Sequence, residues 1–193
     1  MRDLVLASTS RYRRALLDRL GVPYRAVAPR CDEEGLDVLR AEERSLALAE
    51  RKARSVAADF PGALLLGSDQ IAEIEGRALR KPGTIEAARA TLRLLSGREH
   101  RLVTAVALLD SVDGRVENAI DIARLRMRKL SHEEIENYLG REEVLDCVGA
   151  YRSEGLGAAL FEWMRADDPT GIVGLPLTRV VDLLARFGVS VLR

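Results

Sequence analysis

The sequence is poor in cysteine, carries no net charge and contains no long apolar run. Its two cysteines, Cys31 and Cys147, form no CxxC pair. Neither a zinc motif nor a disulfide framework follows, and reduced thiols are expected. Thirty basic residues balance thirty acidic ones, which removes the global charge that attracts duplex nucleic acid or an anionic membrane.

Signals for membranes and secretion are missing as well. No apolar run approaches the roughly 20 residues of a membrane span, and the first residues resemble a strand rather than a signal peptide. The chain is 47% hydrophobic and 31% charged, which is typical of a soluble globule. We expect a cytoplasmic protein with no membrane partner, folded as one domain over residues 1–193.

Several common catalytic signatures are also absent from the sequence. There is no P-loop, no GxGxxG motif and no ordered Ser/His/Asp set. His132 lies in a capping box and is interpreted as structural. His100 stands alone without metal-ligand spacing, so it is not assigned to chemistry either.

What is present is an alternation of strand-like and helical segments, which predicts an α/β domain with a mixed sheet. Ser10 and Thr84 are expected to cap helices, and Ser131 opens a capping box. A bulge is expected near Ala123. The predicted strands cover 4–7, 23–28, 64–69, 71–74, 102–109 and 116–127, the predicted helices cover 11–20, 42–58, 85–95, 132–139 and 178–187, and 167–171 is a predicted loop.

The apolar run that ends in Gly67-Ser68-Asp69 is the centre of the predicted site. A buried strand that stops at polar residues delivers them to the rim of a sheet, where open α/β sheets bind ligands. Asp69 is therefore the first candidate for chemistry. Lys81 follows shortly after, before Pro82, on what we expect to be a fixed loop.

Basic side chains elsewhere suggest an anionic ligand. Ser8, Arg13 and Arg14 surround the start of the first helix, where unpaired N–H groups suit phosphate; the alternative is that these arginines only solvate the helix. Lys52 lies near the apolar face of its helix, where it either snorkels to solvent or points at an anion. Lys81 is either a point charge on a phosphate or an ordinary surface lysine.

The acidic residues Asp32, Glu33 and Glu34 form a second group with Asp69. Carboxylates from separate segments can hold Mg²⁺, which uses one or two of them together with substrate phosphates. The alternative is a solvated acidic loop, and for Glu34 alone we prefer it.

Taken together, these stretches resemble the Maf family of nucleotide pyrophosphatases over almost the whole chain. Each stretch is weak alone, but their order and spacing together are highly specific. The matching pieces are Leu6-Ala7-Ser8-Thr9-Ser10 with Arg13-Arg14, Asp32-Glu33, 49–53 around Lys52, Gly67-Ser68-Asp69, Lys81-Pro82, Leu95-Ser96-Gly97 to His100, Thr104, Gly149-Ala150-Tyr151 and 173–177.

Within that family, the chain looks like the 7-methyl-GTP pyrophosphatases. Gln70 stands where the dTTP/UTP-type members have threonine, and Glu154 stands where they have glutamine. Tyr12 departs from the tryptophan of that subfamily, although both rings can stack on a base.

The resemblance implies a fold like that of the inosine-triphosphate pyrophosphatases, with a mixed twisted sheet, flanking helices and a cleft between two lobes. It implies hydrolysis of 7-methyl-GTP to 7-methyl-GMP and pyrophosphate with a divalent cation, Mg²⁺ or Mn²⁺. Asp69 matches the proton acceptor and a metal ligand, and Glu33 matches a metal-associated position. Tyr12, Gln70 and Glu154 match positions that select the base. The residues that match phosphate-binding positions are Ser8, Arg13, Arg14, Lys52 and Lys81.

Other functions are left open at this point. A Maf pyrophosphatase for dTTP, UTP or CTP is the nearest alternative, and the pair Gln70 and Glu154 argues against it. A nucleotide-sensing regulator of cell division is the alternative without catalysis. The expected partner is a nucleoside triphosphate, and the oligomeric state is left open, with a homodimer among the alternatives.

Overall fold

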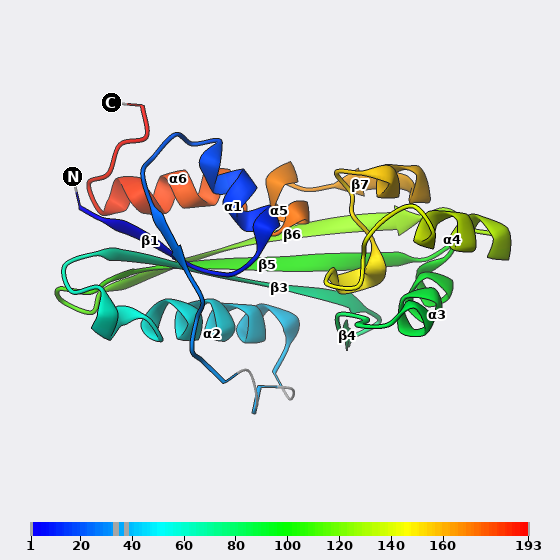
Figure 1. The fold of residues 1–193 in the computed structure, drawn as a ribbon, viewed down its shortest axis with the longest axis horizontal. Coiled ribbons are helices and arrows are strands. Elements are labelled where there is room, and N and C mark those ends of the chain that lie inside the picture. Colours follow the sequence, from blue (N-terminus) through cyan, green and yellow to red (C-terminus); the bar gives the residue numbers. More distant parts are fainter. Residues whose placement is uncertain (1, 33–34, 37–38, 193) are drawn as a thin grey trace.

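A mixed β-sheet runs the length of the molecule (Figure 1). The computed structural model describes residues 2–32, 35–36 and 39–192. Within them, seven strands follow the order β2-β1-β3-β5-β6-β7, with β4 paired to β3 beside this path. The pairs β1–β2 and β1–β3 are parallel and the others antiparallel. The strands are β1 (Leu4–Ala7), β2 (Arg25–Val27), β3 (Leu64–Ile74), β4 (Arg77–Leu79), β5 (Glu99–Asp110), β6 (Val116–Met127) and β7 (Phe161–Arg165).

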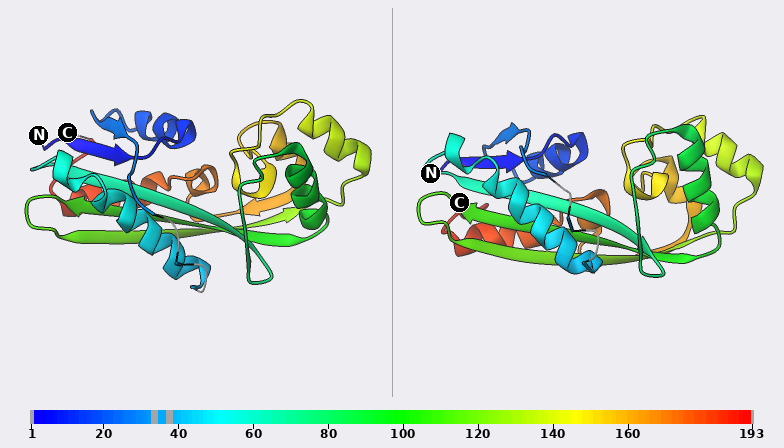
Figure 2. Two further views of the ribbon diagram at one scale, coloured as in Figure 1. Left: turned by 60° about the horizontal axis from the view of Figure 1, so that its bottom comes forward. Right: turned by 90° about the horizontal axis from the view of Figure 1, so that it is seen from below.

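Helices cover both faces of this sheet and one of its ends (Figures 1 and 2). Helix α2 lies on one face, α1, α5 and α6 lie on the other, and α3 and α4 gather at the end away from the two termini. Short 3₁₀ turns η1, η2 and η3 complete the chain. Their bounds are α1 (Arg11–Asp18), α2 (Ala41–Arg54), η1 (Ala57–Asp59), α3 (Ile85–Leu95), α4 (His132–Leu139), η2 (Val148–Ala150), η3 (Leu156–Leu160), α5 (Pro169–Val173) and α6 (Leu177–Arg186).

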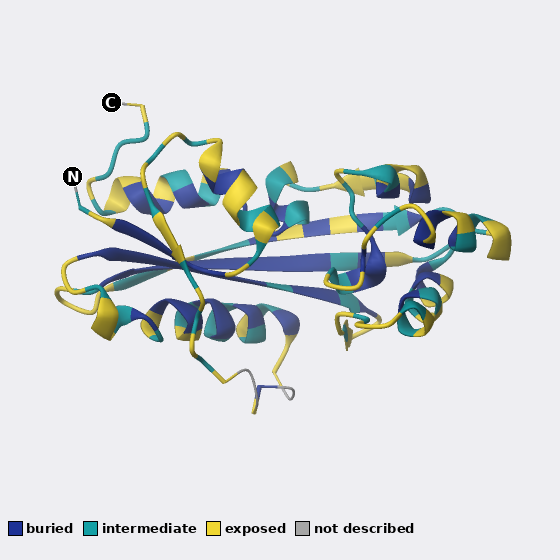
Figure 3. Cartoon of the chain, viewed as in Figure 1, coloured by how far each residue is buried: buried dark blue, intermediate teal, exposed yellow. Residues whose placement is uncertain are grey.

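The apolar residues separate into cores at the two ends of the sheet, which define two lobes. In the lobe that holds the termini, called the α6 lobe, Leu183 of α6 packs with Leu66 of β3 and Leu108 of β5. In the other, called the α3 lobe, Leu92 of α3 packs with Leu102 of β5. Strands β3 and β5 are mostly buried, whereas β6 is only partly buried (Figure 3). Strands β3 and β5 supply residues to both cores.

The sheet edge beside β3 is interrupted between the two lobes. Strand β1 pairs with β3 at 64–66, and β4 pairs with it at 72–74. In the described part of the chain, residues 67–71 of β3 therefore carry no strand on this edge, although β5 pairs with them on the other. The gap leaves one stretch of the central strand open beside the carboxyl end of β1.

Local sequence signals located most elements correctly. Thr84 accepts from the Ala87 N–H and caps α3 at the expected residue, and Ser131 and Glu134 form the expected capping box of α4. The expected mixed sheet with flanking helices is confirmed. Among the described residues, no helix combines the length and the apolar character that crossing a membrane requires.

Three sequence expectations are wrong. Strands β5 and β6 pair in continuous register through Ala123, and the irregularity lies instead between Arg126 and Met127, opposite β7. Residues 167–171 are not a loop, because Asp168 caps the helix α5 by accepting from the Thr170 N–H. The segment 42–58 is not one helix, since α2 ends at Arg54 and a separate 3₁₀ turn follows.

Candidate active site

A cleft of about 870 Å³ lies between the two lobes, over the gap in the sheet edge. Its walls include Ser10 and Arg13 from the α6 lobe and Arg152 and Glu154 from the α3 lobe, with Asp69 of β3 between them. The predicted cleft between two lobes is therefore present. Its volume lies in the range of pockets that bury small-molecule ligands.

The charges around this cleft favour an anion. Among the described residues that line it, seven are basic and three are acidic. Low-dielectric walls of one predominant sign raise the local concentration of a ligand with the opposite charge. The basic residues are Arg13, Arg44, Lys52, Arg77, Arg80, Lys81 and Arg152, and the acidic ones are Asp69, Asp146 and Glu154.

Lys52 and Asp69 form a buried ion pair at the floor of the cleft. Lys52 Nζ donates to Asp69 Oδ1 at 2.6 Å, and the two side chains are only 10% and 11% exposed. The predicted position of Asp69 at a strand end is wrong, because β3 continues to Ile74. Asp69 reaches the cleft because the neighbouring strand β1 ends, not because its own strand does.

Gly67 explains how α2 comes close enough for this pair. A Cβ atom at this position would lie 2.0 Å from the Ala49 carbonyl oxygen and 2.9 Å from the Ala53 nitrogen. Side chains alternate along a strand, so Asp69 faces α2 on the same side of the sheet as Gly67. The small residue lets helix and strand approach, and Lys52, one turn along α2 from Ala49, meets Asp69.

The start of α1 forms one wall of the cleft. Ser10 caps the helix by accepting from the Arg13 N–H, and Arg13 Nε donates to the Gly174 carbonyl at 2.9 Å. Ser8 is buried beneath this turn, where its Oγ accepts from the Ser10 N–H at 3.2 Å. Neither Ser8 nor the exposed Arg14 is among the described residues that line the cleft.

Gln70 faces the opposite side of the sheet from Asp69 and lines the cleft beside α5. Its Nε2 donates to Thr104 Oγ1 at 2.9 Å, to the Gly171 carbonyl at 2.8 Å and to the Ile172 carbonyl at 3.1 Å. These contacts engage the amide nitrogen with protein acceptors. Gln70 therefore fixes α5 against the sheet as well as lining the cleft.

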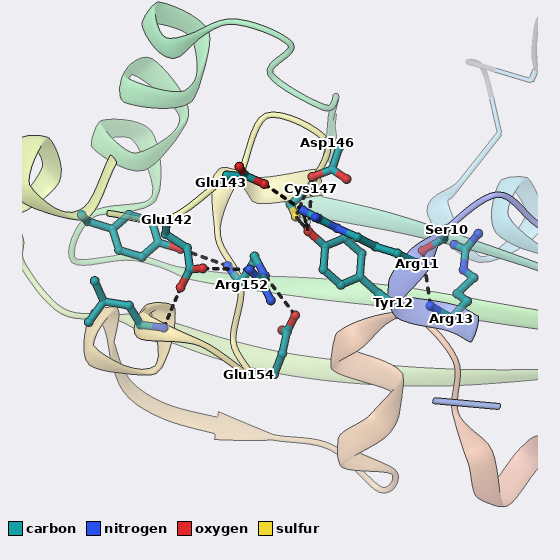
Figure 4. Close-up of polar contacts among 12 residues, drawn as sticks. Ser10, Arg11, Tyr12, Arg13, Glu142, Glu143, Asp146, Cys147, Arg152 and Glu154 are labelled. Atoms are coloured by element: carbon teal, nitrogen blue, oxygen red, sulfur yellow. Dashed lines mark hydrogen bonds and ion pairs between the residues drawn. The ribbon is translucent and has the colours of Figure 1, made fainter. Parts of the chain in front are cut away.

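Tyr12 and Glu154 approach each other from the two lobes (Figure 4). The Tyr12 hydroxyl donates to Asp146 Oδ1 at 3.4 Å, and the Arg152 guanidinium lies 5.2 Å from the centre of its ring. Arg152 Nε in turn donates to Glu154 Oε1 at 3.3 Å. Burial is the main cause that raises the pKa of Tyr12 to about 12, so its hydroxyl stays protonated at neutral pH.

The remaining predicted site residues stand as follows. Lys81 is exposed at the rim of the cleft. Glu33 lies outside the described residues. Among the residues that are described, no group of three or more histidine, cysteine, aspartate or glutamate side chains could hold a metal ion.

Sequence reasoning missed several cleft residues, among them four arginines and the acidic Asp146. Arg44 lies on α2, Arg77 and Arg80 lie on and after β4, and Arg152 follows η2. No local pattern distinguishes these arginines from the other basic residues of the chain. A signal existed only for Arg152, which directly precedes the Ser153-Glu154-Gly155 stretch used for the resemblance.

A mixed sheet with a basic cleft around a buried lysine–carboxylate pair defines an α/β protein with a site suited to an anionic ligand. The sequence model of the family described as "Maf-like protein" matches residues 3–187. The chain therefore belongs to the Maf family.

Curated relatives match over nearly the full length. A protein of Xanthomonas campestris pv. campestris (strain 8004) named "7-methyl-GTP pyrophosphatase" is 46% identical over 190 residues, covering 98% of both chains. One of the same name from Chromobacterium violaceum is 42% identical over 191 residues, covering 98% of this chain and 99% of the relative. The expected family and the expected pyrophosphatase activity are thereby confirmed.

Among solved structures, the Ham1 protein of Staphylococcus aureus aligns with 96% of this chain and 97% of its own. The identity is 15% and the TM-score is 0.46.

Proposed function

We propose that this protein hydrolyses 7-methyl-GTP at the bond between the α and β phosphates, releasing 7-methyl-GMP and pyrophosphate. The observation that carries the proposal is the buried pair of Lys52 and Asp69 at the floor of a basic cleft. Tyr12 and Glu154 at the opposite rims support a base that is both flat and cationic. The names of the full-length relatives agree with this substrate.

The triphosphate is assigned to the basic side of the cleft. Phosphoryl transfer depends mainly on positioning and on stabilising the charge of the phosphate oxygens. Arg13 on α1, Lys52 on α2 and Lys81 in the segment after β4 supply positive charge from three separate parts of the chain. Ser8 and Arg14, which match phosphate positions of the family, act in this proposal through the turn that opens α1.

Asp69 is assigned to the attacking water. Its Oδ1 accepts from Lys52, so Oδ2 is the oxygen that we assign to orienting the water and taking its proton. The water oxygen forms a bond to phosphorus, the α–β anhydride bond breaks, and pyrophosphate leaves. Lys52 fixes the carboxylate in place for this step.

A divalent cation, Mg²⁺ or Mn²⁺, fits the residues present. Mg²⁺ binds through one or two carboxylates plus substrate phosphates and keeps several waters. Asp69 is a carboxylate in a cleft large enough for a triphosphate, so it could serve as such a ligand, together with Glu33 of the family pattern. When bound, the cation would neutralise phosphate charge.

Glu154 is assigned to the choice of base. A 7-methylated guanine carries a positive charge on its imidazole ring, which a carboxylate favours over neutral guanine. A carboxylate also accepts from the N1–H and N2–H₂ groups of guanine. Tyr12 offers a ring for stacking, and Gln70 supports α5 beneath the base. We further propose a cytoplasmic location.

A nucleotide panel tests the proposal directly. Pyrophosphate release is measured with 7-methyl-GTP, GTP, dTTP, UTP and CTP, in the presence of Mg²⁺ or Mn²⁺ and after chelation. The expected result is the highest kcat/KM for 7-methyl-GTP and loss of turnover without a divalent cation. Preference for a pyrimidine nucleotide would overturn the assignment of 7-methyl-GTP as the substrate. Nucleotide binding without pyrophosphate release would overturn the proposed catalytic role.

A further inference from the structure

We propose that Arg152, held by Glu142, is a positioning residue for base selection. It fixes the Glu154 carboxylate relative to the Tyr12 ring. Glu142 neutralises the positive charge of Arg152, so the negative charge of Glu154 is left for the base. The inference rests on the proposed function, because it concerns the same base-binding end of the cleft. Neither Arg152 nor Glu142 is among the residues that the sequence resemblance assigns.

Glu142 is a firm anchor. It is only 12% exposed, its Oε1 accepts from Arg152 Nη1 at 2.8 Å, and its Oε2 accepts from the Leu156 N–H at 2.7 Å. Gly155 makes room for it, since a Cβ atom there would lie 2.5 Å from Glu142 Oε2. One carboxylate therefore holds both ends of the segment 152–156, in which Glu154 lies.

Arg152, held in this way by Glu142, contacts residues on both sides of the cleft. Its Nε donates to Glu154 Oε1, and its guanidinium lies over the Tyr12 ring. The planar guanidinium holds its donors in a rigid fork and stacks on aromatic faces. Tyr12 belongs to α1 in the α6 lobe, whereas Arg152 and Glu154 belong to the α3 lobe (Figure 4). Arg152 thus links the ring to the carboxylate, while Arg11 lies 5.0 Å from the centre of the same ring and belongs to the α6 lobe.

The charges of Glu142, Arg152 and Glu154 determine which base this cluster of three side chains attracts. Arg152 alone would neutralise Glu154, and a neutral pair gives a cationic base no advantage over a neutral one. Glu142 adds a second carboxylate on the far side of Arg152. The cluster then carries one net negative charge, which a cationic base compensates.

Two conservative substitutions separate geometry from charge. Arg152→Lys keeps the positive charge but loses the planar fork, whereas Glu142→Gln keeps the shape but removes the compensating charge. We expect Arg152→Lys to raise KM for 7-methyl-GTP and GTP about tenfold, the size of a lost charge-assisted hydrogen bond. We expect Glu142→Gln to lower the preference for 7-methyl-GTP over GTP about fivefold. In both variants kcat stays within about twofold.

A double-mutant cycle distinguishes positioning from general destabilisation. Both effects should largely disappear when the substitutions are made in a Glu154→Gln background, because the two residues act through that carboxylate. Arg126→Lys is the matched control. Arg126 makes a comparable exposed pair with Glu162, outside the cleft, and its loss should leave KM unchanged.

The outcomes of this experiment are separate from those of the proposed function. Binding of 7-methyl-GMP and GMP is measured alongside turnover. If no triphosphate is hydrolysed, but the wild-type protein prefers 7-methyl-GMP over GMP and Glu142→Gln weakens that preference, the proposed function fails and the inference stands. If it hydrolyses 7-methyl-GTP while Glu142→Gln and Arg152→Lys leave KM and base preference as in wild type, the inference is overturned. Effects that persist undiminished in the Glu154→Gln background also overturn it.

Discussion

Lys52 Nζ and Asp69 Oδ1 lie 2.6 Å apart beneath the cleft, joining helix α2 to strand β3. A buried ion pair is weak evidence for stability, because well-packed apolar residues of similar volume often serve the fold equally well or better. The pair is also placed where β3 lacks a strand on one edge. Its position therefore indicates a role in the chemistry of the cleft rather than in the core.

Replacing Asp69 with asparagine should abolish turnover while the nucleotide still binds. The amide keeps an oxygen that accepts from Lys52 but cannot take a proton from water. A general base contributes typically about 10²–10⁴-fold, so pyrophosphate release should fall by at least about a hundredfold. Isothermal titration with 7-methyl-GMP should give a Kd within a few-fold of wild type, and parallel loss of both would contradict a chemical role.

Replacing Lys52 with methionine should destabilise the fold and not only the site. The substitution leaves the Asp69 carboxylate buried without its partner, a situation that costs about 3–5 kcal/mol. Adding Asp69→Asn should recover much of that loss, since a neutral amide is cheaper to bury than a charge. Urea denaturation measures both variants, and a double variant no more stable than the single one would disprove this explanation.

Replacing Gly67 with alanine should separate helix α2 from strand β3. The added methyl would meet the backbone of Ala49 and Ala53 at less than a contact distance, and overpacking of this kind costs about 1–3 kcal/mol or more. The shift would also move Lys52 away from Asp69. We expect a lower Tm together with lost turnover.

The matched control for that experiment is Gly140→Ala. Gly140 has a right-handed helical backbone with φ −75°, and the nearest atom to its added methyl lies 3.4 Å away. This variant should fold and turn over substrate like the wild type. An equal loss in both variants would mean that the contact with α2 is not the cause.

His100 should make stability depend on pH in a defined window. It is buried against Tyr151, whose hydroxyl lies 2.8 Å from His100 Nε2, and burial lowers the pKa of His100 from 6.5 to about 4. Between these values the unfolded chain binds a proton that the folded chain does not. The free energy of unfolding therefore falls as the pH drops through this window, by up to about 3 kcal/mol.

The variant His100→Gln tests this linkage. The amide can still bond to Tyr151 but does not titrate. Its free energy of unfolding, measured in urea at several pH values, should vary less between pH 4 and 6.5 than that of the wild type. Parallel curves for the two proteins would show that other groups dominate the window.

The sequence predicted those elements whose ends are determined by neighbouring residues. The start of α3 follows from the Thr84 hydroxyl and that of α4 from the Ser131–Glu134 box, and both interactions span three residues. Helix α5 was missed because five residues offer too little periodicity. The capping residue of α5, Asp168, is held in place by a residue ten positions later: the backbone N–H and the hydroxyl of Thr178 both donate to its carboxylate.

The location of Asp69 shows what a sequence pattern cannot supply. The change from apolar to polar residues was interpreted as a strand end, whereas it marks the point where the adjacent strand stops. Pairing of β1 with β3 joins residues about 60 positions apart. No local signal reports where such a partner ends.

The cleft arginines were missed for a similar reason. Arg44, Arg80 and Arg152 come from distant segments and meet only through the fold. By contrast, Lys52 was selected for its place near the apolar face of its helix and Lys81 for its place before Pro82, whereas Glu154 was selected through the family resemblance. Their placement around one cleft agrees with those assignments, while their individual roles stay predictions.

Strands β3 and β5 supply side chains to the cores of both lobes. Neither lobe could therefore be exchanged for the corresponding lobe of a relative, because the junction of such a chimera would have to cut strands that belong to the cores of both lobes. New base preferences are accessible instead through substitutions at the rims, where Arg152 and Glu154 line the cleft, and at Glu142, which bonds to Arg152. Libraries aimed at altered selectivity should therefore keep the strands constant and diversify the rim of each lobe.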